Sequence, residues 1–253
     1  MSAPAAEPPR FSVRRVPLTR PLRWLARGID DLLRSPGASL LHGLAVATAG
    51  ILILLLAQGL PYLFIGAISG FLLVGPILAA GLCELSRRHA QHASANVADA
   101  WQAWRRNPAG LAGFALFSLL AGSLWQIVSM VLVAVLYKGQ ALTPLAFIRD
   151  FLAPAHGLLF FSYLFIGGIF AAGVFALSVV SVPMLVDRDC NWLEAMQASL
   201  AAVAENPLPL ALWAALIMLL CALGFATALL GFILVMPVLG HASWHAYRDL
   251  VTT

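Results

Sequence analysis

The chain has 253 residues, of which 61% are hydrophobic and 10% charged, and its net charge is +4. A soluble domain has about 25% charged residues, so this composition excludes a soluble domain and predicts a protein of the lipid bilayer. The basic residues adjoin apolar segments, so the positive charge indicates membrane topology and attraction to anionic lipid, and no nucleic-acid partner is expected.

The first 37 residues contain no apolar core, so no cleavable signal peptide is expected. Residues 1–18, rich in Ala and Pro, predict a disordered cytoplasmic leader. An amphipathic helix should follow. Its apolar face carries Leu22, Leu25, Ile29 and Leu32, and its polar face carries Arg23, Arg27, Asp30 and Arg34.

Residues 38–83 contain no charged side chain before Glu84. Crossing about 30 Å of hydrocarbon takes about 20 apolar residues, so this run predicts two membrane helices, at 38–57 and 62–83. The segment from Gln58 to Pro61 supplies the turn between them.

A second amphipathic helix should begin after Asn96, which with Asp99 has the spacing of a capping box. Membrane helices are then expected at 109–136 and 157–186. The external loop between them, 137–156, carries apolar residues that predict a short interfacial helix, namely Leu145, Ile148 and Leu152.

A third amphipathic helix should begin after Asn191, which pairs with Glu194 in the same way. Residues 207–247 then have to hold the last two membrane helices, with a tight turn near Gly224. The segment is short, so a re-entrant pair that does not fully cross is the alternative.

These three units have prolines at matching positions. Each amphipathic helix runs into Ser-Pro or Asn-Pro (Ser35-Pro36, Asn107-Pro108, Asn206-Pro207), and each apolar segment leaves through a proline (Pro76, Pro183, Pro237). The sequence therefore predicts an all-α membrane protein with six transmembrane helices, built as three parallel repeats of an amphipathic helix plus a hairpin. The repeats are expected at 19–94, 95–189 and 190–253.

Lys and Arg divide unequally between the two sides of this topology. Only Lys138 and Arg149 fall on the side away from the termini, and thirteen arginines fall on the side of the termini. The positive-inside rule then places both termini in the cytoplasm, and we expect the bacterial inner membrane as the location.

Small residues predict where helices pack. Gly66 and Gly70, and likewise Gly168, Ala172 and Ala176, recur at four-residue spacing, which permits close backbone approach. Gln126 is the one strongly polar residue deep in an apolar segment, and it predicts an interhelical hydrogen bond.

Few residues could carry chemistry. Asp and Glu are absent from every apolar midsection, which weighs against proton- or sodium-coupled transport. No G-x-S-x-G, H-E-x-x-H or phosphate-loop motif occurs, so no catalytic residue is assigned and no enzyme is expected. The three cysteines are scattered, which indicates neither a disulfide framework nor a zinc site.

The candidate ligands are histidines. His241 and His245 stand four residues apart on one helical face, and His42 enters the membrane from the same side. This geometry is one that a metal ion or haem would require, although interfacial anchoring or packing is the more common role of such residues. His89 and His92 are expected to be solvated.

Two stretches resemble a known family. Residues 179–187 read VVSVPMLVD, and residues 237–248 read PVLGHASWHAYR. They resemble a bacterial family of predicted integral membrane proteins catalogued as a domain of unknown function, whose closing motif is similar to PVLGHATWHxYR, with Ser243 here in place of Thr. The resemblance spans about residues 15–250. It implies fold and localisation. Some members are labelled cytochrome c oxidase subunits, which implies an association with the respiratory chain.

Three functions follow as hypotheses. The first is a non-enzymatic accessory or scaffold protein of another membrane complex, whose partners are the lipid bilayer and that complex. The second is a haem- or copper-handling protein that uses the candidate histidines, although no cofactor is required by the sequence. The third is a passive channel or lipid-handling protein lined by the small-residue faces.

Overall fold

The computed structural model describes residues 11–56, 60–139 and 143–252, and at residues 61–65, 68, 69, 72 and 74 it describes only the backbone. Within these ranges the regular secondary structure is helical apart from one pair of two-residue strands, in agreement with an all-α protein. The elements are, in order, β1 (Ser12–Val13), α1 (Arg20–Arg34), α2 (Pro36–Leu56), α3 (Pro61–Leu78), α4 (Ala80–Ala90), α5 (Val97–Arg106), α6 (Pro108–Leu136), α7 (Pro144–Leu152), the 3-10 turn η2 (Pro154–His156), α8 (Gly157–Ser178), α9 (Ser181–Asp187), α10 (Trp192–Glu205), α11 (Pro207–Ala226), α12 (Phe232–Leu250) and β2 (Val251–Thr252).

Three junctions between helices share one backbone conformation. Ser35 has φ −135° and ψ 61°, Asn107 has φ −143° and ψ 71°, and Asn206 has φ −132° and ψ 51°. Proline disfavours the helical conformation in the residue before it, and it fits the first position of the helix that it starts. One residue therefore separates α1 from α2, α5 from α6 and α10 from α11.

The two predicted capping boxes are confirmed. Asn96 accepts hydrogen bonds from the backbone of α5 while Asp99 accepts one from the Asn96 backbone, and Asn191 and Glu194 do the same for α10. Each box satisfies N–H groups that a helix start leaves without a partner.

The predicted helices 62–83 and 157–186 are each broken into two. α3 ends at Leu78 and α4 begins at Ala80, and the break between α8 and α9 lies at residues 179–180. The break at residues 179–180 lies three and four residues before Pro183, which lacks the backbone N–H and whose ring clashes with the carbonyl four residues earlier. Pro76 lies inside α3, three residues before the break at Ala79, so this effect does not explain that break. Pro237 lies inside the continuous helix α12.

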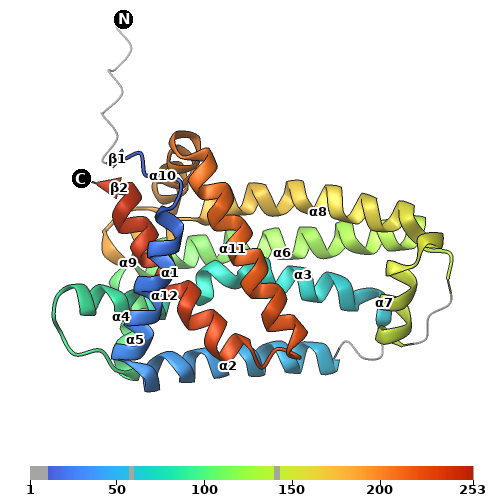
Figure 1. Cartoon of the computed structure of the whole chain (residues 1–253), viewed down its shortest axis with the longest axis horizontal. Coiled ribbons are helices and arrows are strands. Elements are labelled where there is room, and N and C mark those ends of the chain that lie inside the picture. The colour runs from blue at the N-terminus through green and yellow to red at the C-terminus, as the bar shows by residue number, and fades with distance from the viewer. Residues whose placement is uncertain (1–10, 57–59, 140–142, 253) are drawn as a thin grey trace, which may run out of the picture.

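Among the described residues, four stretches are long and apolar enough to cross a membrane: Pro36–Leu56, Pro108–Leu136, Pro154–Asp187 and Pro207–Ala226. α2, α3, α6 and α8 run side by side along the long axis of the molecule (Figure 1). α7 lies across one end of these helices, and α1, α4, α5 and α9 lie at the other end.

The α11–α12 hairpin does not reach the end of the bundle that α7 covers. The turn between α11 and α12 lies beside Gly50 of α2 and Phe71 of α3, away from the end that α7 covers (Figure 1). This turn spans residues 227–231, a few residues after the predicted position near Gly224. The other predicted turn, at Gln58–Pro61, falls mostly outside the described residues, which exclude 57–59.

Both ends of the described chain meet. Ser12 pairs with Thr252 and Val13 with Val251 in an antiparallel ladder. Asn206 fixes this arrangement from the α10–α11 junction, because its side chain accepts from Val16 N at 2.8 Å and donates to Arg14 O at 3.0 Å.

The predicted short helix in the loop 137–156 is confirmed as α7. Phe147 and Phe151 face inward, and Tyr137 donates to Asp150 Oδ2 at 2.6 Å. Aromatic contacts between Tyr137 and Phe147 and between Phe151 and Tyr163 attach α7 to the ends of α6 and α8.

Candidate functional site

Polar side chains gather where α12 passes between α1 and α2. Two glycines permit this close approach. A Cβ at Gly28 would lie 2.6 Å from Val238 O, and a Cβ at Gly43 would collide with Ile233 O. The backbones therefore touch, and the side chains of the second half of α12 reach α1, α2 and α4.

Asp31 of α1 is the centre of this group and is 2% exposed. Its Oδ2 accepts hydrogen bonds from Ser86 Oγ at 2.7 Å and from His245 Nε2 at 2.9 Å. Arg34 approaches its Oδ1 at 3.7 Å, and His89 Nδ1 lies 3.4 Å from the same oxygen. A buried carboxylate needs such partners, because leaving a charge without water costs several kcal/mol per ion. We call Asp31, Ser39, Ser86, His89, His241 and His245 the Asp31 cluster.

His241 of α12 has both ring nitrogens engaged. Nε2 lies 2.9 Å from Ser39 Oγ, and Nδ1 lies 2.7 Å from Ser86 Oγ. Since Ser86 Oγ donates its proton to Asp31, it accepts at His241, so His241 Nδ1 carries the proton and Nε2 accepts from Ser39. The result is a directed hydrogen-bond chain from α2 through α12 and α4 to α1.

The charge state of Asp31 follows from this geometry. Burial opposes ionisation, but the hydrogen bonds from His245 and Ser86 outweigh it, so the pKa of the Asp31 carboxyl lies below its ordinary value. Asp31 is thus an ionised carboxylate that accepts hydrogen bonds.

The candidate ligands occupy related but separate places. His241 and His245 both reach the Asp31 cluster, but His42 Nε2 lies 2.6 Å from Leu78 O at the end of α3. Among the described residues no group of three or more His, Cys, Asp or Glu side chains is arranged to hold a metal ion. His241 uses both ring nitrogens within the protein, so it could bind a metal only by giving up one of these hydrogen bonds. His42 and His245 each use one ring nitrogen, and metal ligation stays a prediction.

His89 is the residue that the sequence placed wrongly. Its side chain is 8% exposed and its ring stacks on that of His241 at a centroid distance of 6.4 Å. α4 follows the break after Pro76 and turns this polar stretch against α12, which the continuous helix predicted at 62–83 did not anticipate. His92 is exposed, as predicted.

Two further carboxylates with charged partners lie at the same end, Glu84, which is buried, and Asp249, which is partly buried. Glu84, 1% exposed, accepts two hydrogen bonds of 2.7 Å from Arg87 and one of 3.2 Å from Arg88. Asp249 accepts from Arg20 at 2.6 Å and from Trp24 Nε1 at 2.7 Å. Burial opposes the ionisation of Asp249, but the hydrogen bonds from Arg20 and Trp24 lower the pKa of its carboxyl overall. Neither the partners of Glu84 nor those of Asp249 were predicted from the sequence.

Asn107 and Tyr247 complete the polar connections. Asn107 donates to Cys190 O at 2.7 Å and accepts from Gly110 N at 2.9 Å, so it joins the α5–α6 junction to the start of α10. Tyr247 donates to Asp187 Oδ2 at 2.8 Å and accepts from Arg188 Nε at 2.7 Å. These contacts connect α12 to α9.

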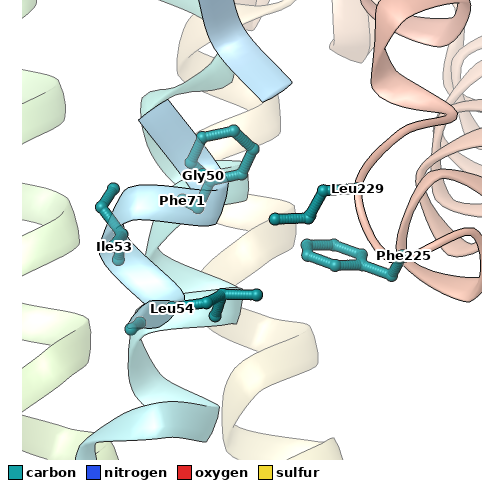
Figure 2. A pocket seen from close by; sticks show the side chains of 7 residues that line it. Gly50, Ile53, Leu54, Phe71, Phe225 and Leu229 are labelled. Carbon is teal, nitrogen blue, oxygen red and sulfur yellow. The ribbon is translucent and has the colours of Figure 1, made fainter. Parts of the chain in front are cut away.

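Hollows in the apolar half of the described structure are lined by hydrophobic side chains. Figure 2 shows a small one, between the α11–α12 turn and the α2–α3 pair, where Phe71, Phe225 and Leu229 converge. It is lined by apolar residues alone and holds about 10 Å³, so it gives a polar ligand nothing to bind.

A larger hollow is a groove of about 500 Å³ between α6 and α8. It is apolar and opens sideways from the bundle. We call it the α6–α8 groove, and its lining residues are Phe117, Leu120, Ala121, Leu124, Ile169, Phe170, Gly173, Val174 and Leu177.

The prediction that small residues mark helix packing holds in α3 and fails in part of α8. Gly66 faces α6, where an added Cβ would collide with the side chain of Gln126 at 2.5 Å, so the packing prediction is confirmed there. Gly168 has no neighbour within 4 Å and is exposed with Ala172, so the prediction is wrong for this part of α8. Gln126 Nε2 is buried without a hydrogen-bond partner, which does not support its predicted interhelical bond.

Searches of curated proteins and of solved structures find no match in either. Residues 63–187, from α3 to the end of α9, match the family described as "Predicted integral membrane protein (DUF2189)". The matched region contains Ser86, His89 and the α6–α8 groove, whereas Asp31 and the histidines of α12 lie outside it. Over residues 63–187 the chain is therefore similar to a family of predicted integral membrane proteins.

Proposed function

We propose that the protein is a non-enzymatic accessory or scaffold of a membrane complex, and that the α6–α8 groove is where a transmembrane helix of that complex packs. The groove carries this proposal. It lies within two of the candidate membrane spans, its lining is apolar, and residues on both of its walls are exposed, including Leu120 at 60% and Ile169 at 61%. Small residues such as Ala121 and Gly173 leave room for side chains of a second helix.

The polar end supports the same function because its carboxylates are engaged in contacts within the protein. The buried carboxylates Asp31 and Glu84 and the partly buried Asp249 each accept hydrogen bonds from side chains of the protein itself. Such contacts hold α1, α4 and α12 in fixed positions, which suits a protein that presents a surface to others.

The topology that we propose has six membrane helices, with both termini in the cytoplasm of a bacterium and the protein in its inner membrane. The pairing of β1 with β2 supports an even number of crossings, whether the last hairpin spans fully or is re-entrant. The excess of arginine at the end that holds the termini supports the orientation.

Photo-crosslinking tests the scaffold function. A benzoylphenylalanine at Leu120 or Ile169 in the groove is compared with one at Leu219 of α11, which is 59% exposed on another face. We expect one crosslinked membrane protein from both groove positions and none from Leu219. Crosslinks to lipid alone from all three positions would disprove the groove as a docking site and favour the lipid-handling alternative.

The second candidate, haem or copper handling, is favoured by the convergence of His241 and His245 on the Asp31 cluster. It is tested by the absorption spectrum and metal content of gently solubilised protein, compared with a His241→Ala/His245→Ala variant. Metal or haem that is present in the parent and lost in the variant supports it. A colourless, metal-free parent after reconstitution rejects it.

A further inference from the structure

The helix α1 has three distinct faces. Its buried face contains Trp24, Gly28 and Asp31, which pack against α12 and the helices beside it. The rest of its circumference is exposed, and it divides into two stripes of opposite character.

The first exposed stripe is apolar. Leu22, Ile29 and Leu33 are 52%, 46% and 67% exposed, and with Ala26 they recur at the spacing of one helical face. Nothing in the described part of the chain covers this stripe. Leucine and isoleucine side chains exposed in a row at one helix face mark a contact surface.

The second stripe is basic and lies one residue further round the helix. Arg23, Arg27 and Arg34 are all exposed on it, with Asp30 as the single acidic residue among them. Arg27 is 3.8 Å from Asp249 and keeps a side-chain exposure of 49%, so its charge also faces solvent.

The position of α1 relative to the candidate membrane span α2 indicates that these stripes contact lipid. Only Ser35 separates α1 from α2, which is a candidate membrane span. α1 lies across the direction of α2 at the end of the bundle (Figure 1). A helix that lies in the membrane surface buries an apolar face among the lipid chains and places its Lys and Arg at the headgroups.

We infer that α1 is a lipid-binding helix that selects anionic phospholipid, with its apolar stripe inserted at the membrane surface and Arg23, Arg27 and Arg34 at the lipid phosphates. The occupant follows from charge complementarity and from continuity with the span. α10 provides the internal contrast, since it also precedes a span and exposes Leu193 and Leu200, but it contains two glutamates and no Lys or Arg. The inference does not depend on the scaffold function.

Lipid retention tests the basic stripe. The purified full-length protein is equilibrated with equal amounts of phosphatidylglycerol and phosphatidylcholine, and the retained lipid is measured by mass spectrometry. An Arg23→Gln/Arg27→Gln variant should lose the preference for phosphatidylglycerol by about fivefold per charge, the factor equivalent to about 1 kcal/mol. An Arg23→Lys/Arg27→Lys variant should keep it.

The control variant Arg14→Gln/Arg15→Gln has the same net charge but lies outside α1, and it should retain phosphatidylglycerol as the parent does. Equal retention by the parent and the Arg23→Gln/Arg27→Gln variant, or equal loss in the control, would overturn the inference.

A spin label tests the apolar stripe separately and does not need the arginine variants to fold. A nitroxide at Leu33→Cys is compared with one at Asp30→Cys in a Cys190→Ser background, with the protein in vesicles. Oxygen, which partitions into lipid, should relax the label at 33 more, and a water-soluble nickel chelate should relax the label at 30 more. Equal access of the chelate to both positions would overturn the inference.

Discussion

The two ends of the α12 hairpin are held together by different forces. Where α12 passes α1, α2 and α4, the contacts are hydrogen bonds and ion pairs around carboxylates such as the buried Asp31 and the partly buried Asp249. Where the α11–α12 turn meets α2 and α3, the contacts are apolar, as between Phe71 and Phe232. The polar end should therefore depend on charge and on exact partners, whereas the apolar region should depend on shape.

Removal of the central carboxylate should have the largest effect. An Asp31→Ala change leaves Ser86 and His245 without their shared acceptor, and breaking a buried charged pair in this way costs about 3–5 kcal/mol. The measurement is the free energy of unfolding in detergent. Asp30→Ala, at the exposed neighbour, is the matched control and should change it by less than about 0.5 kcal/mol. Equal effects of the two changes would show that the cluster does not stabilise the fold.

Acid should weaken the polar end by the same route. The pKa values of Asp31 and Asp249 lie below the ordinary value of about 3.9, so their contribution to stability is complete above that pH and is lost as the pH falls through the lower folded values. The loss should be smaller than for Asp31→Ala, because a protonated carboxyl still forms hydrogen bonds.

Unfolding measured between pH 6 and pH 2 checks this expectation. The stability of an Asp31→Asn/Asp249→Asn variant should fall less steeply with acid than that of the parent. Parallel curves for the two proteins would assign the acid sensitivity to other groups.

Local signals in the sequence predicted the parts of this architecture that depend on neighbouring residues. The capping boxes at Asn96 and Asn191, the turns at the Ser-Pro and Asn-Pro steps and the short helix α7 each depend on residues within a few positions of one another. Proline chemistry also accounts for the break after α8, which precedes Pro183. Hydrophobicity alone predicts neither this break nor the one after α3, because both lie in apolar stretches.

The Asp31 cluster could not be predicted in the same way. Asp31 is 55 residues from Ser86 and 214 residues from His245. A single sequence carries no information that joins such distant positions, so Asp31 was not singled out within its amphipathic helix and His89 was expected to be solvated. The signal that was available was the pair His241 and His245 on one face of α12, which indicated candidate ligands or anchors and which did not point to Asp31 or Ser86.

Two glycine substitutions compare the close packing of α2 on the first turn of α12 with the open face of α8. Gly43→Ala places a Cβ into the backbone of α12 at Ile233, and overpacking of this kind costs about 1–3 kcal/mol. Gly168→Ala, in α8, meets nothing within 4 Å. Both glycines are in helices, so alanine gains the same helix propensity at each, and the difference in unfolding free energy isolates the collision. A stabilised Gly43→Ala variant would mean that α12 does not lie against α2.

The smallest effect should come from a single hydrogen bond inside the membrane region. Ser129 of α6 and Tyr163 of α8 have their oxygens 3.0 Å apart. Hydrogen bonds between membrane helices contribute about 0.6 kcal/mol on average, because the unfolded state in the membrane also finds partners. Ser129→Ala should therefore lower the unfolding free energy by about that amount, and Ser123→Ala, at an exposed position of the same helix, should leave it unchanged. A loss for Ser129→Ala as large as that for Asp31→Ala would remove the distinction between the two regions, since it would show that polar contacts determine stability in the apolar region as well.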